Sequence, residues 1–169
     1  MNATSLATIF RSLNDGSVRY LVAGGLAVVA HGYVRFTADV DLILDMDEEN
    51  LTKAASIFTT LGYKPRAPVA LGAFAKAENR RAWREEKGLT VFSLWSAEHS
   101  MTEIDLFVEL PFDDFEAAFA RGLRVEVAPG VKATMVGLED LMELKRRAAR
   151  PKDIEDMARL SALQERDHD

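Results

Sequence analysis

The sequence predicts a fold of the α+β or α/β class, in which helices flank a mixed β-sheet. Apolar runs of strand length are interspersed with segments of helical periodicity, and glycine or proline separates most of them. The 169 residues contain no repeat, no low-complexity stretch and no linker. We therefore expect a single domain over residues 1–169, with a core at about 18–135 and a helical pair at about 138–163.

The first half of the chain carries the clearer pattern. Four apolar residues recur at helical spacing between Leu6 and Leu13, and the run 39–44 alternates as a strand does. Asp47 is placed to cap a helix whose first turn holds two more acids, where the helix dipole favours negative charge. These signals predict helices at 5–13, at 26–31 and between Asp47 and Gly62, and strands at 18–23 and 39–44.

The second half is less regular. Pro65 and Pro68 bound a predicted loop, and the segment 73–86 favours a helix although its apolar stripe is poor. Pro129 and Gly130 indicate a hairpin turn. The remaining expected elements are strands at 89–95, 103–108, 124–127 and 131–135, and helices at 112–120, 138–149 and 151–163.

The composition excludes several classes of protein. The chain has no cysteine, which excludes a disulfide scaffold, a thiolate zinc site and a cysteine nucleophile. Its most apolar run, 21–34, is interrupted by glycines and falls short of the ~20 residues that a membrane span requires. No export signal is recognisable in residues 1–15, so we expect a cytoplasmic protein without membrane association.

The charges are distributed unevenly. The net charge is −6, from 21 basic and 27 acidic residues, which disfavours an autonomous nucleic-acid binder. Residues 39–50 hold six acids and no base, whereas residues 143–152 hold five bases and one acid. A small domain with one acidic and one basic cluster suggests a site where the two meet.

Three aspartates are candidates for a metal site. On a strand at 39–44, Asp39 and Asp41 share one face, where two like charges repel each other unless a cation lies between them. Asp105 lies between apolar residues of a second predicted strand. Three carboxylates on adjacent strands suit Mg²⁺, although a solvated strand edge explains a lone Asp-x-Asp equally well.

The segments before the aspartates add phosphate-binding features. Gly24 and Gly25 stand between a predicted strand and a predicted helix, where backbone N–H groups can hold phosphate and the absence of a Cβ allows close approach. A tight turn would need the same residues. Arg35 and Thr37 alternate with the two aspartates of the strand, so four polar groups can share one side.

This ordered set of residues resembles the polymerase-β-type nucleotidyltransferase superfamily. The shared features are Gly24-Gly25, then Asp39-x-Asp41, then a third carboxylate at Asp105. The C-terminal residues resemble the motif of the abortive-infection-type, toxin–antitoxin-associated branch. That motif comprises Leu138-Glu139-Asp140-Leu141, Lys145, Arg150, Lys152-Asp153 and Asp156. The resemblance spans about 22–160, leaves about 65–98 unmatched, and departs from the family where Gly25 replaces a frequent serine.

The resemblance implies a Mg²⁺-dependent transfer of a nucleoside monophosphate from an NTP such as ATP to an acceptor hydroxyl of a protein, a small molecule or an RNA end. Asp39 and Asp41 would bind two Mg²⁺ ions, which Mn²⁺ can replace, and Asp105 would bind one of them and help to deprotonate the acceptor. Lys145 would meet the triphosphate, although a lysine near a helix C-terminus also suits the helix dipole.

Two alternatives remain open at the level of sequence. One is a non-catalytic or regulatory protein that binds a toxin or antitoxin partner. The other is attack at the γ-phosphorus rather than the α-phosphorus, because both reactions need the same metal-binding carboxylates.

Overall fold

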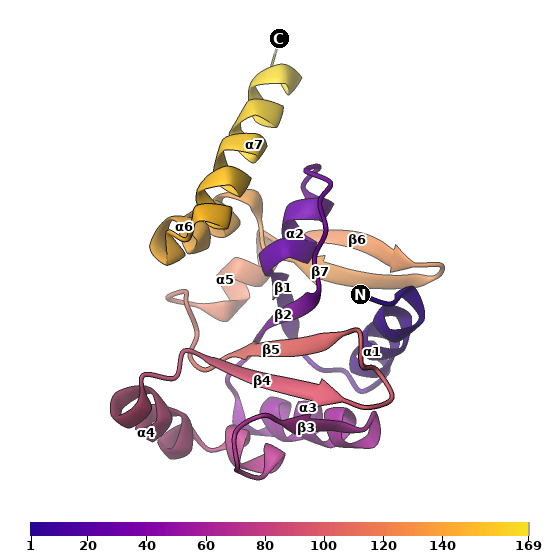
Figure 1. Cartoon of the computed structure of the whole chain (residues 1–169), viewed down its shortest axis with the longest axis vertical. Coiled ribbons are helices and arrows are strands. Elements are labelled where there is room, and N and C mark those ends of the chain that lie inside the picture. The colour runs from indigo at the N-terminus through magenta and orange to yellow at the C-terminus, as the bar shows by residue number, and fades with distance from the viewer. Residues whose placement is uncertain (169) are drawn as a thin grey trace.

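A mixed seven-stranded sheet forms the centre of the computed structural model, which describes residues 1–168 (Figure 1). The strands lie in the order β3-β4-β5-β2-β1-β7-β6. Their bounds are β1 Tyr20–Ala23, β2 Asp39–Leu44, β3 Tyr63–Pro65, β4 Val91–Ser96, β5 Glu103–Phe107, β6 Leu123–Ala128 and β7 Val131–Met135. The helices are α1 Ala3–Asp15, α2 Gly24–Ala30, α3 Glu48–Thr60, α4 Ala77–Lys87, α5 Phe115–Ala120, α6 Leu138–Ala148 and α7 Pro151–Asp167, with a 3₁₀ turn η1 at Leu71–Ala75.

Strand β2 lies in the middle of the sheet, antiparallel to β1 and parallel to β5. The pair β1–β7 is also parallel, whereas β3–β4, β4–β5 and β6–β7 are antiparallel. The sheet is therefore mixed, and the predicted fold class is confirmed. Because the pairing partners of β2 come from distant parts of the chain, residues far apart in sequence meet at its edge.

Burial alternates along the central strands. In β2, Val40 and Leu42 are buried whereas Asp39 and Asp41 are partly exposed, and in β5 Ile104 and Leu106 are buried on either side of Asp105. The buried face belongs to the hydrophobic core, which also includes residues of α1 and α3. The partly exposed face carries the polar residues.

Most predicted elements are confirmed, with a few differences in bounds. Strand β2 has the predicted limits, but α2 begins at Gly24 instead of residue 26, because Gly24 adopts a φ of +60° at the strand-to-helix turn. The predicted loop at Pro65 begins as the short edge strand β3, where Pro65 occupies a position that tolerates proline. The segment 73–86 divides into η1 and α4.

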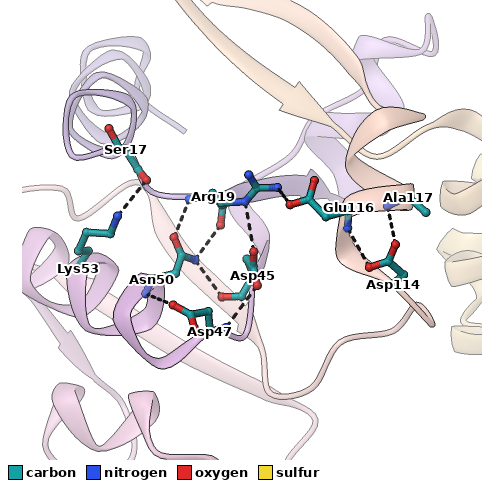
Figure 2. A network of polar contacts seen from close by, with 9 residues as sticks. All are labelled: Ser17, Arg19, Asp45, Asp47, Asn50, Lys53, Asp114, Glu116 and Ala117. Atoms are coloured by element: carbon teal, nitrogen blue, oxygen red, sulfur yellow. Dashed lines mark hydrogen bonds and ion pairs between the residues drawn. The ribbon is translucent and has the colours of Figure 1, made fainter.

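The acids that follow β2 form a structural network, shown in Figure 2. Asp47 caps α3, accepting from the Asn50 backbone N–H at 3.3 Å, and Asp45 accepts from Arg19 Nε at 3.2 Å. The Asn50 side chain bridges to the backbone of Arg19, and Arg19 also pairs with Glu116 at the start of α5. The prediction that Asp47 caps a helix with two acids in its first turn is confirmed.

Helices α6 and α7 pack against each other, and α6 also contacts α2 (Figure 1). Helix α7 then carries the C-terminus away from the sheet. Helix α2 ends at Ala30, one residue before the predicted limit, so His31 follows it, and His31 Nε2 lies 2.8 Å from the carbonyl oxygen of Val136. No helix within residues 1–168 combines the length and apolar character needed to cross a bilayer.

Candidate active site

A cavity of about 770 Å³ opens where β1, β2 and β5 meet the junction of α6 and α7. It brings together every site residue that the sequence predicts, although these are spread over 122 positions of the chain. The residues concerned are Gly24, Gly25, Arg35, Thr37, Asp39, Asp41, Asp105 and Lys145.

Strand register places the three aspartates side by side. Asp41 pairs with Ala23 of β1 on one side and with Asp105 of β5 on the other, and Asp39 lies two residues before Asp41 on the same face. A Cβ added to Gly24 would overlap with the Asp41 carboxylate. Glycine is therefore required at position 24 both by its positive φ and by this close approach.

The aspartates differ in their hydrogen bonding. Among residues 1–168, no donor forms a hydrogen bond or ion pair with the side chain of Asp39 or Asp41 within the usual distances, whereas Ser93 Oγ donates to Asp105 Oδ1 at 2.6 Å. Burial, followed by the negative charge of Asp105, raises the pKa of Asp41 to about 7. The same two causes raise the pKa of Asp39. Asp39 and Asp41 thus hold negative charge at an energetic cost, as is typical of a site that binds a cation.

The donor chemistry fits Mg²⁺. Across residues 1–168, no three His, Asp or Glu side chains converge closely enough to hold a metal ion unaided. Mg²⁺ usually takes one or two carboxylates and completes its coordination with water and substrate phosphates. Asp39 and Asp41, with Asp105 beside them, supply the oxygen ligands for such a partly open site.

Arg35 and Thr37 lie on an extended segment that leads into β2, and both side chains turn towards α2. A Cβ added to Gly25 would overlap with Thr37 Oγ1, and it would lie 2.8 Å from Thr37 Cβ and 3.0 Å from Arg35 Nη1. The Thr37 hydroxyl therefore occupies the space that a side chain at position 25 would need. This arrangement accounts for the glycine at position 25 of this chain.

Lys145 is buried within a network of ion pairs. Its Nζ lies 2.8 Å from Asp156 Oδ2 and 3.1 Å from Asp153 Oδ1, and its side chain is only 6% exposed. Asp156 also accepts two hydrogen bonds of 2.7 Å from Arg35, and Asp153 accepts one of 2.7 Å from Arg150. Burial acts to raise the pKa of Asp153 and Asp156, but the hydrogen bonds and charges of the surrounding cations together outweigh it and lower the pKa of both carboxyls. Arg150 and Asp153 therefore form an ion pair.

Two polar residues of the site were not among the sequence predictions. Ser93 pairs with Asp105 because of the β4–β5 register, which no local sequence signal gives. Arg150, named from the sequence only as part of the C-terminal motif, lines the cavity. Apolar residues complete the cavity wall, among them Leu141 and Leu144 of α6 and the exposed Phe36.

Comparison with known proteins supports the fold. No family model matches the sequence, and no curated protein matches it. Solved structures match over nearly the whole chain, and three of them show the range of similarity. A proposed nucleotidyltransferase from Thermotoga maritima is 16% identical, with a TM-score of 0.57, over 92% of this chain and 89% of that protein. ANT(2")-Ia in complex with adenylyl-2"-tobramycin is 14% identical, with a TM-score of 0.60, over 96% and 88%.

The third structure is the lincosamide antibiotic adenylyltransferase LnuA with bound lincomycin. It is 16% identical to this chain, with a TM-score of 0.61, over 95% of this chain and 97% of LnuA. These matches establish that the chain has the fold of nucleotidyltransferases. Its particular reaction has to be argued from its own residues.

Proposed function

We propose that this protein is a metal-dependent nucleotidyltransferase that moves a nucleoside monophosphate from an NTP to an acceptor hydroxyl. The observation that carries the proposal is the register of β2 and β5, which sets Asp41 beside Asp105, with Asp39 on the same face, at the floor of a cavity with cationic residues in its wall. The fold shared with nucleotidyltransferases supports the same reaction class.

The metal ions would be held by Asp39, Asp41 and Asp105, with two Mg²⁺ expected and Mn²⁺ as a substitute. When bound, they supply charge neutralisation and Lewis-acid polarisation of the phosphates. The residues of the chain then have separate tasks. Backbone N–H groups at Gly24 and Gly25, with Thr37 and Arg35, position the phosphates, and Lys145 adds positive charge to the wall.

The transfer step conserves atoms and charge. The acceptor oxygen forms a bond to the α-phosphorus, and the bond from that phosphorus to the bridging oxygen of the β-phosphate breaks, which releases pyrophosphate. Asp105 receives the hydroxyl proton as the oxygen attacks. The hydrogen bond from Ser93 to one carboxylate oxygen leaves the other oxygen of Asp105 available for this task.

ATP is the nucleotide we propose, and a small hydroxylated molecule is the acceptor we favour over a protein side chain or an RNA end. Two structural neighbours support this choice, because one is a lincosamide antibiotic adenylyltransferase and the other was solved with adenylyl-2"-tobramycin. A cavity of about 770 Å³ is of the size that proteins use for small ligands. The negative net charge also disfavours a long nucleic acid.

We also propose membership of the abortive-infection-type branch, with action in the cytoplasm. The support is the C-terminal motif, whose Lys145, Asp153 and Asp156 form one buried network at the wall of the cavity.

The proposal is tested with purified protein, Mg²⁺ and ATP labelled at either the α- or the γ-phosphate, against a panel of hydroxylated small molecules, proteins and RNA. We expect transfer of the α-label with release of pyrophosphate, and loss of transfer in Asp39→Ala and Asp105→Ala. Transfer of the γ-label would contradict the proposal in favour of a kinase. Full activity in both variants would contradict the site assignment.

A further inference from the structure

We propose that Arg150, rather than Lys145, is the side chain that contacts the β- and γ-phosphates of the nucleotide, and that Lys145 acts through Asp153 to hold Arg150 in place. This inference rests on the proposed function, because it assigns a residue to the same nucleotide site. It separates two basic residues that the sequence places close together.

Lys145 has little capacity left for a substrate. An ammonium group has three N–H donors, and two are directed at Asp153 and Asp156, at 3.1 and 2.8 Å. Both carboxylates are themselves buried, with side chains 3% and 1% exposed. Moving Lys145 towards a phosphate would leave two buried aspartates with one cation fewer, which is strongly unfavourable.

Arg150, unlike Lys145, is exposed and has donors to spare. Its side chain is 75% exposed and lines the cavity, yet its Nε is fixed to Asp153 Oδ2 at 2.7 Å. A guanidinium has five N–H donors, and Asp153 engages only Nε and, at 3.5 Å, Nη2. Among residues 1–168 the remaining donors meet no partner, so they can form the bidentate contacts that arginine makes with phosphate.

The charge of the network favours an anion at this position. Arg35, Lys145 and Arg150 carry three positive charges, whereas Asp153 and Asp156 carry two negative ones. The surplus positive charge is located on the exposed member, Arg150. The carboxylates of Asp39, Asp41 and Asp105 line the same cavity, so a triphosphate with its cations would be complementary to both groups of charges.

Asp153 is the link between the two basic residues. One of its oxygens faces Lys145 and the other accepts from Arg150 Nε and, at 3.2 Å, from the Arg150 backbone N–H at the start of α7. Arg150 is thereby held at both its backbone and its side chain. Such a preorganised guanidinium loses little entropy when it binds phosphate.

The test compares the binding of ATP and AMP to the full-length protein by isothermal titration calorimetry with Mg²⁺ and no acceptor. We expect Arg150→Gln to weaken ATP binding about 10- to 100-fold, as for the loss of a hydrogen-bonded charge, and to change AMP binding less than about twofold. Arg150→Lys should be intermediate for ATP. Arg146→Gln is the matched control, because Arg146 lies on the exposed side of α6, pairs with Glu143 and is absent from the cavity wall.

The role of Lys145 is tested by thermal unfolding of the same proteins. We expect Lys145→Met to lower the Tm markedly and Arg150→Gln to lower it less, because Lys145 pairs with both buried aspartates whereas the exposed Arg150 pairs with Asp153 alone. A Lys145→Met protein that keeps the wild-type Tm but loses ATP binding would place the phosphate contact on Lys145 and overturn the inference. Wild-type affinity for ATP in Arg150→Gln, or equal losses for ATP and AMP, would also overturn it. If the wild-type protein bound neither nucleotide, the proposed function would fail as well.

Discussion

The acidic run that follows residue 38 divides into two halves with opposite environments. Asp39 and Asp41 share a face of the central strand, without a hydrogen-bond donor from residues 1–168 on either carboxylate. Four residues further on, Asp45 and Asp47 each accept hydrogen bonds, from Arg19 and from the backbone at the start of α3 (Figure 2). Similar side chains thus serve different purposes within a single short segment.

The difference shows which acids stabilise the fold and which weaken it. An acid that caps a helix or pairs with arginine contributes to stability, whereas clustered acids that lack a cation reduce it. The raised pKa of Asp41 expresses that cost, which arises mainly from burial and then from the charge of Asp105. A site that is unfavourable without its ligand is characteristic of binding and catalysis.

The largest difference in activity and stability should appear when one aspartate from each half of the acidic run is replaced by asparagine. We expect Asp41→Asn to lower the rate of transfer by on the order of 10³-fold, because a metal ligand is lost. Without metal, the Asp41→Asn variant should nevertheless be more stable than the wild-type protein by roughly 2 kcal/mol, because a desolvated charge is removed. Asp45→Asn should retain activity and lose less than about 1 kcal/mol. Transfer assays measure the activity of each variant, and denaturant unfolding in EDTA measures its free energy of unfolding. An Asp41→Asn protein less stable than the wild type would contradict the idea that the clustered acids weaken the fold.

The next largest effect should come from Gly25→Ser, which introduces a side chain where Thr37 already lies. We expect a loss of about 1–3 kcal/mol from overpacking and weaker ATP binding. Adding Thr37→Ala should restore much of the stability, because it removes the overlapping hydroxyl. Gly72→Ala is the control, since nothing lies within 4 Å of a Cβ at that position. Independent, additive effects of the Gly25 and Thr37 changes would show that the two side chains do not compete.

A smaller effect is expected from Ser93→Ala, which removes the hydrogen bond to Asp105. Loss of such a supporting contact typically costs 10- to 100-fold, and we expect a fall in kcat of about 10-fold with little change in KM for ATP. Ser93→Thr, which keeps the hydroxyl, should recover part of the rate. Ser56→Ala on the exposed side of α3 provides the control, and an equal fall in that variant would assign the effect to general instability.

The smallest effect on activity should come from Asp47→Ala, because Asp47 belongs to the half of the acidic run whose carboxylates accept hydrogen bonds. Loss of the helix cap should cost about 1 kcal/mol of unfolding free energy and leave transfer unchanged. Chemical denaturation and the transfer assay measure the two quantities. A clear drop in kcat at constant Tm would show that the paired acids also take part in the reaction.

The sequence predicted the central strand well because its signal is local. Alternation over 39–44 gave the limits of β2 and the shared face of Asp39 and Asp41. The edge strand β3 was missed because it is three residues long and ends in proline. The start of α2 was placed two residues late because glycine is a poor helix former, and only the turn at Gly24 reveals why it stands there.

The sequence predicted individual residues of the site but not the tertiary contacts between them. The sequence indicated Arg35 and Lys145 as cations near phosphate, yet their shared partner Asp156 lies 121 residues from Arg35. Such a contact depends on how α7 docks, which no periodicity encodes. The hydrogen bond from Ser93 likewise depends on the pairing of β4 with β5. Roles that arise from tertiary contacts were therefore the ones missed.

The separation of Arg35 from Asp156 also has a consequence for synthesis on the ribosome. The nascent chain contains all three aspartates of the floor once residue 105 has been made, but the partners that order Arg35 and Arg150 belong to the last helix. Chains emerge at about 5–20 residues per second, so Asp153 and Asp156 follow residue 105 by several seconds. Arg35 and Arg150 can therefore become ordered only after residues 153 and 156 have been made, and a chain that stops before them would carry the three aspartates without the ordered cations.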